Sequence, residues 1–209
     1  MFLDELPEFQ KATLEVLRAP LEDREVMINR SQISLTYPCN FMLIASMNPC
    51  PCGYYGSETK TCTCTTEQIR RYMGKISGPL LDRIDIHIEV SGVQYKKLSK
   101  EENTETSAEI RKRVNKARKI QQIRYQNYHI YSNSELTPRL IEKYCKIDQS
   151  AENLLQMAFD RLGLSARAYG RILKVARTIA DLAGRENITK EDIAEAIQYR
   201  SLDRKYWGN

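Results

Sequence analysis

The sequence has no apolar run long enough to cross a bilayer, and its N-terminus has no basic region ahead of an apolar one. These absences indicate neither membrane insertion nor secretion, so we expect a cytoplasmic location and no membrane partner. The sequence also has no internal repeat and no low-complexity tract, which argues against a repeat array or a compositionally disordered chain.

The composition is that of a folded protein. The chain has 209 residues, of which 42% are hydrophobic and 28% charged, so it can form one large core or two small ones. Its formal charge of +5 is modest and comes from basic segments. This charge permits an anionic partner without requiring one.

An apolar run, Met1-Phe2-Leu3, ends in the adjacent carboxylates Asp4 and Glu5. This pattern predicts a buried strand that delivers acidic groups to the edge of an α/β sheet. In P-loop ATPases it is the Walker B arrangement, in which Asp4 would hold the Mg²⁺ of a bound nucleotide and Glu5 would polarise water. A strand that runs into an acidic turn is the alternative.

A second apolar run of strand length, residues 41–47, ends at Asn48-Pro49. An amide offers a donor and an acceptor together, so Asn48 could bind both a nucleophilic water and a γ-phosphate. A simple Asn-Pro turn is the alternative. Between the two runs, helical spacing predicts one short helix from Pro7 that Pro20 ends.

Residues 25–37 contain two β-prone runs on either side of Asn29-Arg30-Ser31, which predicts a hairpin with a cation at its tip. It is either an ordinary sheet extension or a projecting finger whose Arg30 touches a polymer.

Four of the six cysteines fall in one loop between residues 50 and 64. They form two close pairs, Cys50 and Cys52, then Cys62 and Cys64. Four thiolates arranged in this way can close a tetrahedron around Zn²⁺, so a zinc site is the first interpretation. Free thiols come second and an iron–sulfur cluster third. Cys39 and Cys145 are interpreted as buried small apolar residues.

Arg83 lies in a Pro-started turn of helix just before the alternating run 86–90, which is typical of a strand. An arginine presented there could reach a neighbouring subunit's nucleotide and stabilise charge on its γ-phosphate. An ion pair with Asp82 or Asp85 is the alternative. His87 on the predicted strand is interpreted as structural.

Beyond a polar, loop-like stretch from Lys96 to Thr106, a Thr106-x-x-Glu109 capping box opens a helix over residues 107–125. Its polar faces are rich in Lys and Arg, including Arg111, Lys112 and Arg113. Such a face is either a solvated surface or a nucleic-acid contact.

Four more helices are expected from residue 131 onward. Their start signals are Thr137-Pro138, Ser150, Ser165 and Thr189, and Gly163 and Gly184 end the second and third. Arg167, near the start of the third helix, could face phosphate oxygens.

Asp4-Glu5, Asn48, Arg83 and Arg167 stand in the order of Walker B, sensor 1, arginine finger and sensor 2 of AAA+ ATPases. The chain resembles magnesium-chelatase-like bacterial AAA+ proteins of the ComM/YifB type. The similar segments are Phe-Leu-Asp-Glu-Leu-Pro-Glu-Phe, Ala-Ser-Met-Asn-Pro-Cys-Pro-Cys-Gly, Ser-Gly-Pro-Leu-Leu-Asp-Arg-Ile-Asp, Ala-Arg-Thr-Ile-Ala-Asp-Leu and Tyr-Arg-Ser-Leu-Asp-Arg.

The resemblance implies an α/β plus all-α fold, the C-terminal half of a AAA+ P-loop NTPase core over residues 1–130 followed by a helical lid over 131–209. It implies an ATP- and Mg²⁺-dependent motor that forms a homo-oligomer, expected to be a hexameric ring. It also implies a link to DNA, in competence and recombination, as a translocase or branch-migration factor. Residues 25–37 match the family's pre-sensor hairpin.

One departure from the family is the absence of a G-x-x-x-x-G-K-S/T phosphate loop. The chain therefore looks like the C-terminal part of a longer protein, and we expect it to be inactive by itself. The resemblance places the missing central strand between strands 41–47 and 86–90. Two other functions stay open: a non-catalytic zinc module that binds nucleic acid or protein, and a chelatase motor acting on a tetrapyrrole.

Overall fold

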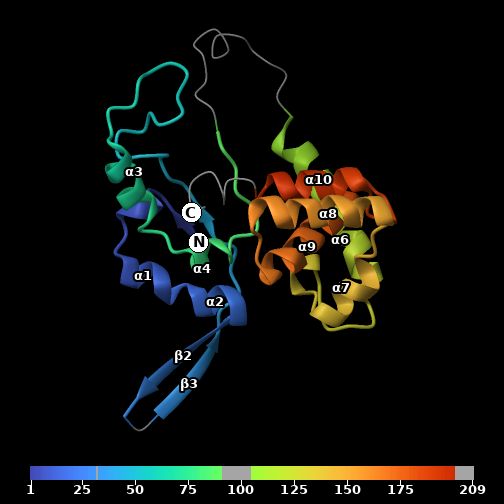
Figure 1. Ribbon diagram of the computed structural model, residues 1–209. Coiled ribbons are helices and arrows are strands. Elements are labelled where there is room, and N and C mark those ends of the chain that lie inside the picture. The colour runs from blue at the N-terminus through green and yellow to red at the C-terminus, as the bar shows by residue number, and fades with distance from the viewer. Residues whose placement is uncertain (32, 91–104, 201–209) are drawn as a thin grey trace. The chain divides into compact units, whose positions relative to one another are not determined.

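The computed structural model describes residues 1–31, 33–90 and 105–200, which form two compact units (Figure 1). The first contains Met1–Ile84 and the second Asp85–Arg204. The predicted polar stretch 96–106 lies largely outside the described residues, as do the last four residues of Tyr-Arg-Ser-Leu-Asp-Arg. Among the described helices, none has the length and apolar character that a membrane span requires.

The first unit is built on a short parallel pair of strands, β1 (Phe2–Leu3) and β4 (Ile44–Ala45). Phe2 pairs with Ile44 and Leu3 with Ala45. The amide of Leu6 continues the contact by donating to Ser46 O at 2.9 Å. The strand predicted over 41–47 is thus present but is limited to the two residues that have a ladder partner.

Short helices pack in the same unit, while Phe2 and Ile44 of the strand pair stay exposed. The helices are η1 (Leu6–Glu8), α1 (Lys11–Val16), α2 (Arg18–Asp23), α3 (Thr66–Met73) and α4 (Gly78–Leu81). The buried apolar cluster of this unit comprises Leu6, Leu14, Leu80 and Leu81 from these helices, together with Ile76. The prediction of one helix ended by Pro20 is wrong, because Pro20 lies in the first turn of α2, where a proline removes no helical hydrogen bond.

The predicted hairpin is confirmed as β2 (Glu25–Arg30) paired antiparallel with β3 (Ile33–Pro38). It extends from the end of α2 away from the first unit's helices (Figure 1). Almost all of its residues are exposed, on both faces of the ribbon. No other part of the described chain covers the hairpin. Its shape therefore agrees with a projecting finger rather than with an extension of a larger sheet.

The alternating run Ile86–Val90 is not a strand in this structure, so that prediction is wrong. Ile86, Ile88 and Val90 are all exposed. A strand needs a neighbouring strand to accept and donate its hydrogen bonds, and the described residues supply none there. Instead, the His87 amide of this run donates to Tyr199 O at 2.8 Å.

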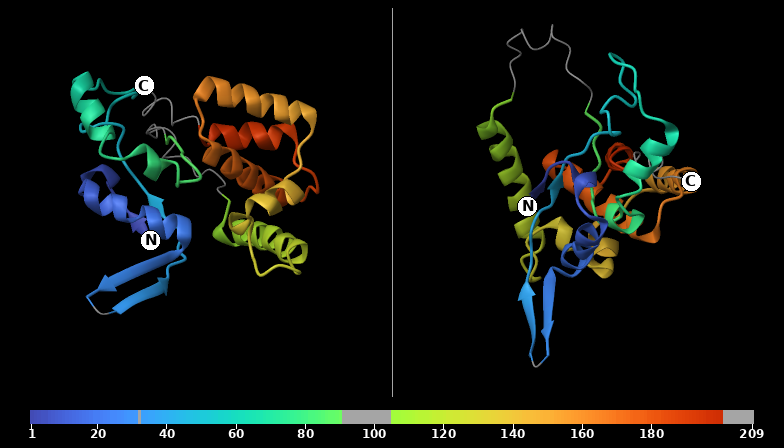
Figure 2. Two further views of the ribbon diagram at one scale, coloured as in Figure 1. Left: turned by 60° about the horizontal axis from the view of Figure 1, so that its bottom comes forward. Right: turned by 90° about the vertical axis from the view of Figure 1, so that its left-hand side faces the viewer.

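The second unit is a helical bundle (Figure 2). Its helices are α6 (Ser107–Arg124), η2 (Asn133–Glu135), α7 (Pro138–Tyr144), α8 (Gln149–Leu162), α9 (Ala166–Leu182) and α10 (Lys190–Gln198). Helix α9 is central, since it packs against α6, α7 and α10. One face of α9, including Ile172, Leu173 and Ala176, is fully buried in the core.

Most predicted helix starts are confirmed. Thr106 and Thr189 form capping boxes, and Ser165 caps α9 by accepting from the Ala168 amide. The start of α8 differs, because Asp148 rather than Ser150 accepts from the Ala151 amide. Gly163 ends α8 with a φ of 60°, a left-handed conformation that glycine adopts without strain.

Helix α6 packs with the helices that follow it. Ala117 and Gln121 are buried on its inner face, and Arg124 pairs with Asp181 of α9. The structure places the boundary between its two units after Ile84, whereas the sequence analysis predicts a boundary after residue 130. The difference comes from the inner face of α6, whose two buried residues hold it in the bundle.

Candidate functional site

The carboxylates Asp4 and Glu5 lie at the end of β1, as the apolar run before them predicts, but the strand is not buried, since Phe2 is 62% exposed. The Ser46 hydroxyl, just past β4, donates to Asp4 Oδ1. The Glu5 amide also donates to this oxygen, at 3.1 Å. Glu5 has a left-handed backbone with a φ of 51°, which turns the chain sharply away from the strand at this point.

Asn48 lies three residues past the end of β4 and is brought to the same sheet edge by the parallel pairing of β1 with β4. Its side chain lies against Gly53 of the cysteine loop, where a Cβ would be 4.0 Å from Asn48 Cγ. Gly53 has a φ of 81°, a conformation that suits glycine. The strand pair therefore collects Asp4, Glu5 and Asn48 at one exposed edge.

Tyr72 of α3 belongs to this edge and was not singled out from the sequence. It is 6% exposed, and the Asn48 backbone amide lies near enough to its phenol to oppose the rise of its pKa. Burial and the nearby carboxylates of Glu8 and Glu5 raise the pKa of Tyr72. The sequence does not indicate this role for Tyr72, because it lies among the apolar residues of an amphipathic helix, a pattern that indicates only core packing.

The chemistry of this edge fits a hard cation and a nucleotide. Mg²⁺ prefers oxygen ligands, of which it usually takes one or two carboxylates together with water and phosphate. Asp4 and Ser46 offer a carboxylate and a hydroxyl oxygen in contact, and Asn48 offers an amide oxygen at the same sheet edge. The residues present therefore suit the Mg²⁺ of a bound nucleoside triphosphate.

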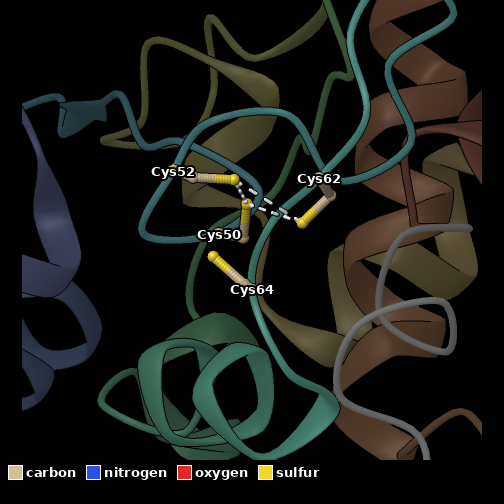
Figure 3. A group of neighbouring side chains, drawn as sticks. All are labelled: Cys50, Cys52, Cys62 and Cys64. Carbon is tan, nitrogen blue, oxygen red and sulfur yellow. Dashed lines mark hydrogen bonds between the residues drawn. The ribbon is translucent and has the colours of Figure 1, made fainter.

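The four cysteines of the loop converge (Figure 3). Their Sγ atoms all lie within 4.8 Å of one another, with 3.4 Å between Cys50 and Cys52, 3.7 Å between Cys50 and Cys62, and 3.6 Å between Cys52 and Cys62. Four sulfurs bound tetrahedrally at about 2.3 Å from Zn²⁺ are roughly 3.8 Å apart. The three separations among Cys50, Cys52 and Cys62 thus fit zinc, the Cys64 sulfur lies within 4.8 Å of each of them, and none of the four is in a disulfide.

The pKa values of the thiols in this cluster shift in opposite directions, and that of Cys64 is raised, first of all by burial. Backbone amides of Tyr54 and Thr63 donate to Cys52 and lower its pKa to about 5. A bond from the Cys64 amide favours the Cys62 thiolate too, but burial and the neighbouring sulfurs raise the pKa of Cys62 to about 12. Such mutual repulsion is relieved when a divalent metal shares the sulfurs, because coordination deprotonates thiols.

Arg83 follows α4 and is turned back onto its own unit. Its Nη2 lies 2.8 Å from Glu22 Oε2, and its Nε and Nη1 donate to the carbonyls of Arg18 and Pro79. An ion pair was expected with Asp82 or Asp85 as the alternative to a finger, but the pairing residue here is Glu22. Glu22 is distant in sequence, so no local pattern could have indicated it.

The remaining predicted site residues are exposed. Arg167 is the second residue of α9, and Arg111, Lys112 and Arg113 lie on the outer face of α6. Arg113 also forms a two-bond pair with Glu105 at 2.5 and 3.0 Å. Arg30 ends β2 at the far end of the hairpin. Arg167 belongs to the second unit and Asp4 to the first.

Four features of the structure were expected for a magnesium-chelatase-like protein. They are the acidic end of β1, the polar segment after β4, the projecting hairpin and the helical bundle. Residues 1–98 match the family described as magnesium chelatase, subunit ChlI, and residues 104–200 match its C-terminal family. The chain belongs to the magnesium-chelatase-like proteins of the ComM/YifB type.

Individual relatives agree with this assignment. The chain is 44% identical over 206 residues to "Competence protein ComM" of Haemophilus influenzae. It is 41% identical over 209 residues to the uncharacterized protein YifB of Salmonella typhimurium. Each match covers 98% of this chain but only 39% of the relative's length, so the chain spans well under half of the curated relatives it matches.

Proposed function

We propose that this chain is the C-terminal part of a AAA+ ATPase that couples ATP hydrolysis to the remodelling of DNA. The observation that carries the proposal is the parallel β1 and β4 pair, which places Asp4, Glu5 and Asn48 at one sheet edge. Family membership supports the same conclusion, since the chain belongs to the magnesium-chelatase-like proteins, whose resemblance implies Walker B and sensor 1 roles for these residues. Here "the complete protein" means this chain together with the segment that supplies its phosphate loop.

Each residue at the edge has one task in this proposal. Asp4 would bind Mg²⁺, and the bound Mg²⁺ would neutralise part of the negative charge of the phosphates. Glu5 orients the attacking water and accepts its hydrogen bond, while Asn48 binds the water and the γ-phosphate together. Without a phosphate loop these groups have no nucleotide to act on. We therefore expect this chain alone to hydrolyse ATP no faster than background.

Two arginines complete the proposed site. Arg83 stabilises the γ-phosphate of the nucleotide held by a neighbouring copy, which requires a homo-oligomer and favours a hexameric ring. Arg167 contacts the nucleotide of its own copy, because it lies on a bundle that follows the same core in the chain. Its position in the first turn of α9 places it beside helix-terminal amides that suit phosphate.

DNA is the proposed polymer. The basic side chains Arg111, Lys112 and Arg113 on α6, with Arg30 on the hairpin, offer phosphate contacts without base readout. A relative named as a competence protein supports a role connected with DNA. In this scheme the cysteine loop carries a structural Zn²⁺ that fixes the chain beside Asn48, since a Cβ at Gly53 of that loop would lie 4.0 Å from the Asn48 side chain.

The experiment compares ATP hydrolysis by the complete protein with that of Glu5→Gln and of a control, Glu8→Gln. Glu8 is an exposed carboxylate on the same turn and pairs with Lys75 at 3.5 Å. Glu5→Gln should bind ATP normally and lose hydrolysis by roughly 10²-fold or more. Glu8→Gln should stay near wild type. Equal activity in Glu5→Gln and wild type would overturn the proposal.

The four-sulfur cluster favours a second candidate, a zinc module that binds nucleic acid or protein without catalysis. Under this alternative the complete protein would show no ATP hydrolysis, and removal of zinc would abolish binding of the partner. ATP hydrolysis that persists after zinc removal would exclude it.

A further inference from the structure

The Arg83 guanidinium is held within its own unit by three acceptors on its three nitrogens. Nη2 pairs with Glu22 Oε2 at 2.8 Å, Nε donates to Arg18 O at 3.1 Å, and Nη1 donates to Pro79 O at 2.7 Å. The Arg83 side chain is only 10% exposed. In this arrangement the guanidinium is engaged on α2 and α4 and is not extended toward a second molecule.

We propose that Glu22 is a latch that competes with a phosphate anion for Arg83. The proposal rests on the proposed function for the source of that anion, which is the terminal phosphate of a nucleotide bound by a neighbouring copy. Carboxylate and phosphate both bind the planar guanidinium fork through the same N–H groups. Glu22 and a phosphate therefore cannot occupy Nη2 together.

Glu22 is the partner that can leave. The carbonyls of Arg18 and Pro79 are fixed by the backbone of α2 and α4, whereas Glu22 is a side chain that is 36% exposed and can rotate into water. It is also the charged member of the three acceptors. A terminal phosphate carries more negative charge than one carboxylate, so it can replace Glu22 as the counter-ion of Arg83.

The packing of α1 and α2 against α4 does not depend on the latch. Arg18 Nη1 donates to Glu15 Oε2 at 2.6 Å, and the nearby Ser77 hydroxyl and Arg18 lower the pKa of Glu15. Leu14 and Leu80 are also buried together in the apolar cluster of this unit. Release of Glu22 thus frees the end of α2 without dismantling the unit.

The end of α2 is also the base of the hairpin. Arg24 follows the helix with a left-handed φ of 58°, and β2 begins at the next residue, Glu25. The Arg24 carbonyl accepts from the Cys39 amide at 2.6 Å, which joins the start of β2 to the end of β3. A change at Glu22 is therefore transmitted to both strands within three residues. The latch couples the state of Arg83 to the hairpin that carries Arg30.

The test uses inorganic triphosphate as the probe and NMR of the Arg83 Nε–H group in this chain. The variants are Glu22→Gln and a charge-matched control, Asp23→Asn, an exposed carboxylate one residue further along α2. Because the carboxylate competitor is removed, Glu22→Gln should bind triphosphate roughly threefold to tenfold more tightly than wild type. Asp23→Asn should change the affinity by less than about twofold. Equal effects of the two variants would overturn the latch.

Wild-type chain gives a second measurement that does not need a folded variant. Triphosphate should shift the Arg83 Nε–H signal and the backbone amides of Ile28 and Leu35 in the hairpin with the same midpoint. An Arg83 signal that does not respond, or a hairpin that does not follow it, would overturn the coupling.

ATP hydrolysis by the complete protein separates this inference from the proposed function. Glu22→Gln should raise the basal rate by a factor similar to its gain in triphosphate affinity. If wild type hydrolyses ATP and Glu22→Gln does not raise the rate, the latch is wrong. If triphosphate competes with Glu22 but the complete protein never hydrolyses ATP, the competition stands and the ATPase proposal is wrong.

Discussion

Asp181 of α9 is the residue whose loss should most damage the helical bundle. Its side chain is fully buried and accepts from Arg124 Nη1 at 2.8 Å and Nη2 at 2.5 Å, from Arg177 Nε at 3.1 Å and from Asn133 Nδ2 at 2.9 Å. Arg177 is only 2% exposed. Asp181→Asn keeps the shape but leaves two guanidinium groups without their counter-ion.

Breaking a buried pair by removing one partner costs about 3 to 5 kcal/mol, because the remaining charge is left in a poorly solvated site. For a chain of this size that loss lowers the Tm by roughly 10 °C. The free energy of unfolding can be measured by urea titration followed by far-UV circular dichroism. The control, Asp160→Asn at an exposed position of α8, should change it by about 0.5 kcal/mol or less. A loss in Asp181→Asn no larger than in the control would refute the reasoning.

Three further predictions concern metal, DNA and pH. Protein purified without chelators should carry one zinc per chain and Cys52→Ser should carry less, whereas metal analysis that finds no zinc would remove the zinc assignment. DNA binding should be independent of sequence, and charge reversal of Arg111, Lys112 and Arg113 should reduce the slope of log K against log salt by about 3; an unchanged slope would exclude these residues. The Ala151 amide and Ser150 hydroxyl lower the pKa of Asp148. Its contribution to stability is therefore present above the usual aspartate pKa of about 3.9 and lost as pH falls through the lowered value, and Asp148→Asn should flatten this part of a stability–pH profile.

Features specified by neighbouring residues were predictable from the sequence. The capping boxes at Thr106 and Thr189 need only residues three apart, and the structure forms both. The cysteine cluster likewise depends on two close pairs in one loop. Asp148 was missed as the cap of α8 because Ser150, two residues away, offers the same chemistry.

Features that need a distant partner were not predictable. The run Ile86–Val90 alternates like a strand, but strand formation depends on a neighbour that the pattern does not identify. The pairing of Arg83 with Glu22 joins two segments on either side of the hairpin and cysteine loop. Asp181, inside a helical pattern, gave no sign that Arg124 and Arg177 would converge on it. For such residues the sequence identifies a charged side chain, but it does not identify the distant residue that forms the ion pair with it.

The central claim is that Glu5 and Asn48 of one copy act on the same nucleotide as Arg83 of the next. The direct measurement mixes two variants of the complete protein, Arg83→Ala and Glu5→Gln, each of which should hydrolyse ATP about 10²- to 10³-fold more slowly than wild type. A mixed ring can place an intact Glu5 beside an intact Arg83 from its neighbour, so partial activity should return. If mixed rings form and remain as inactive as either variant alone, the shared site is contradicted.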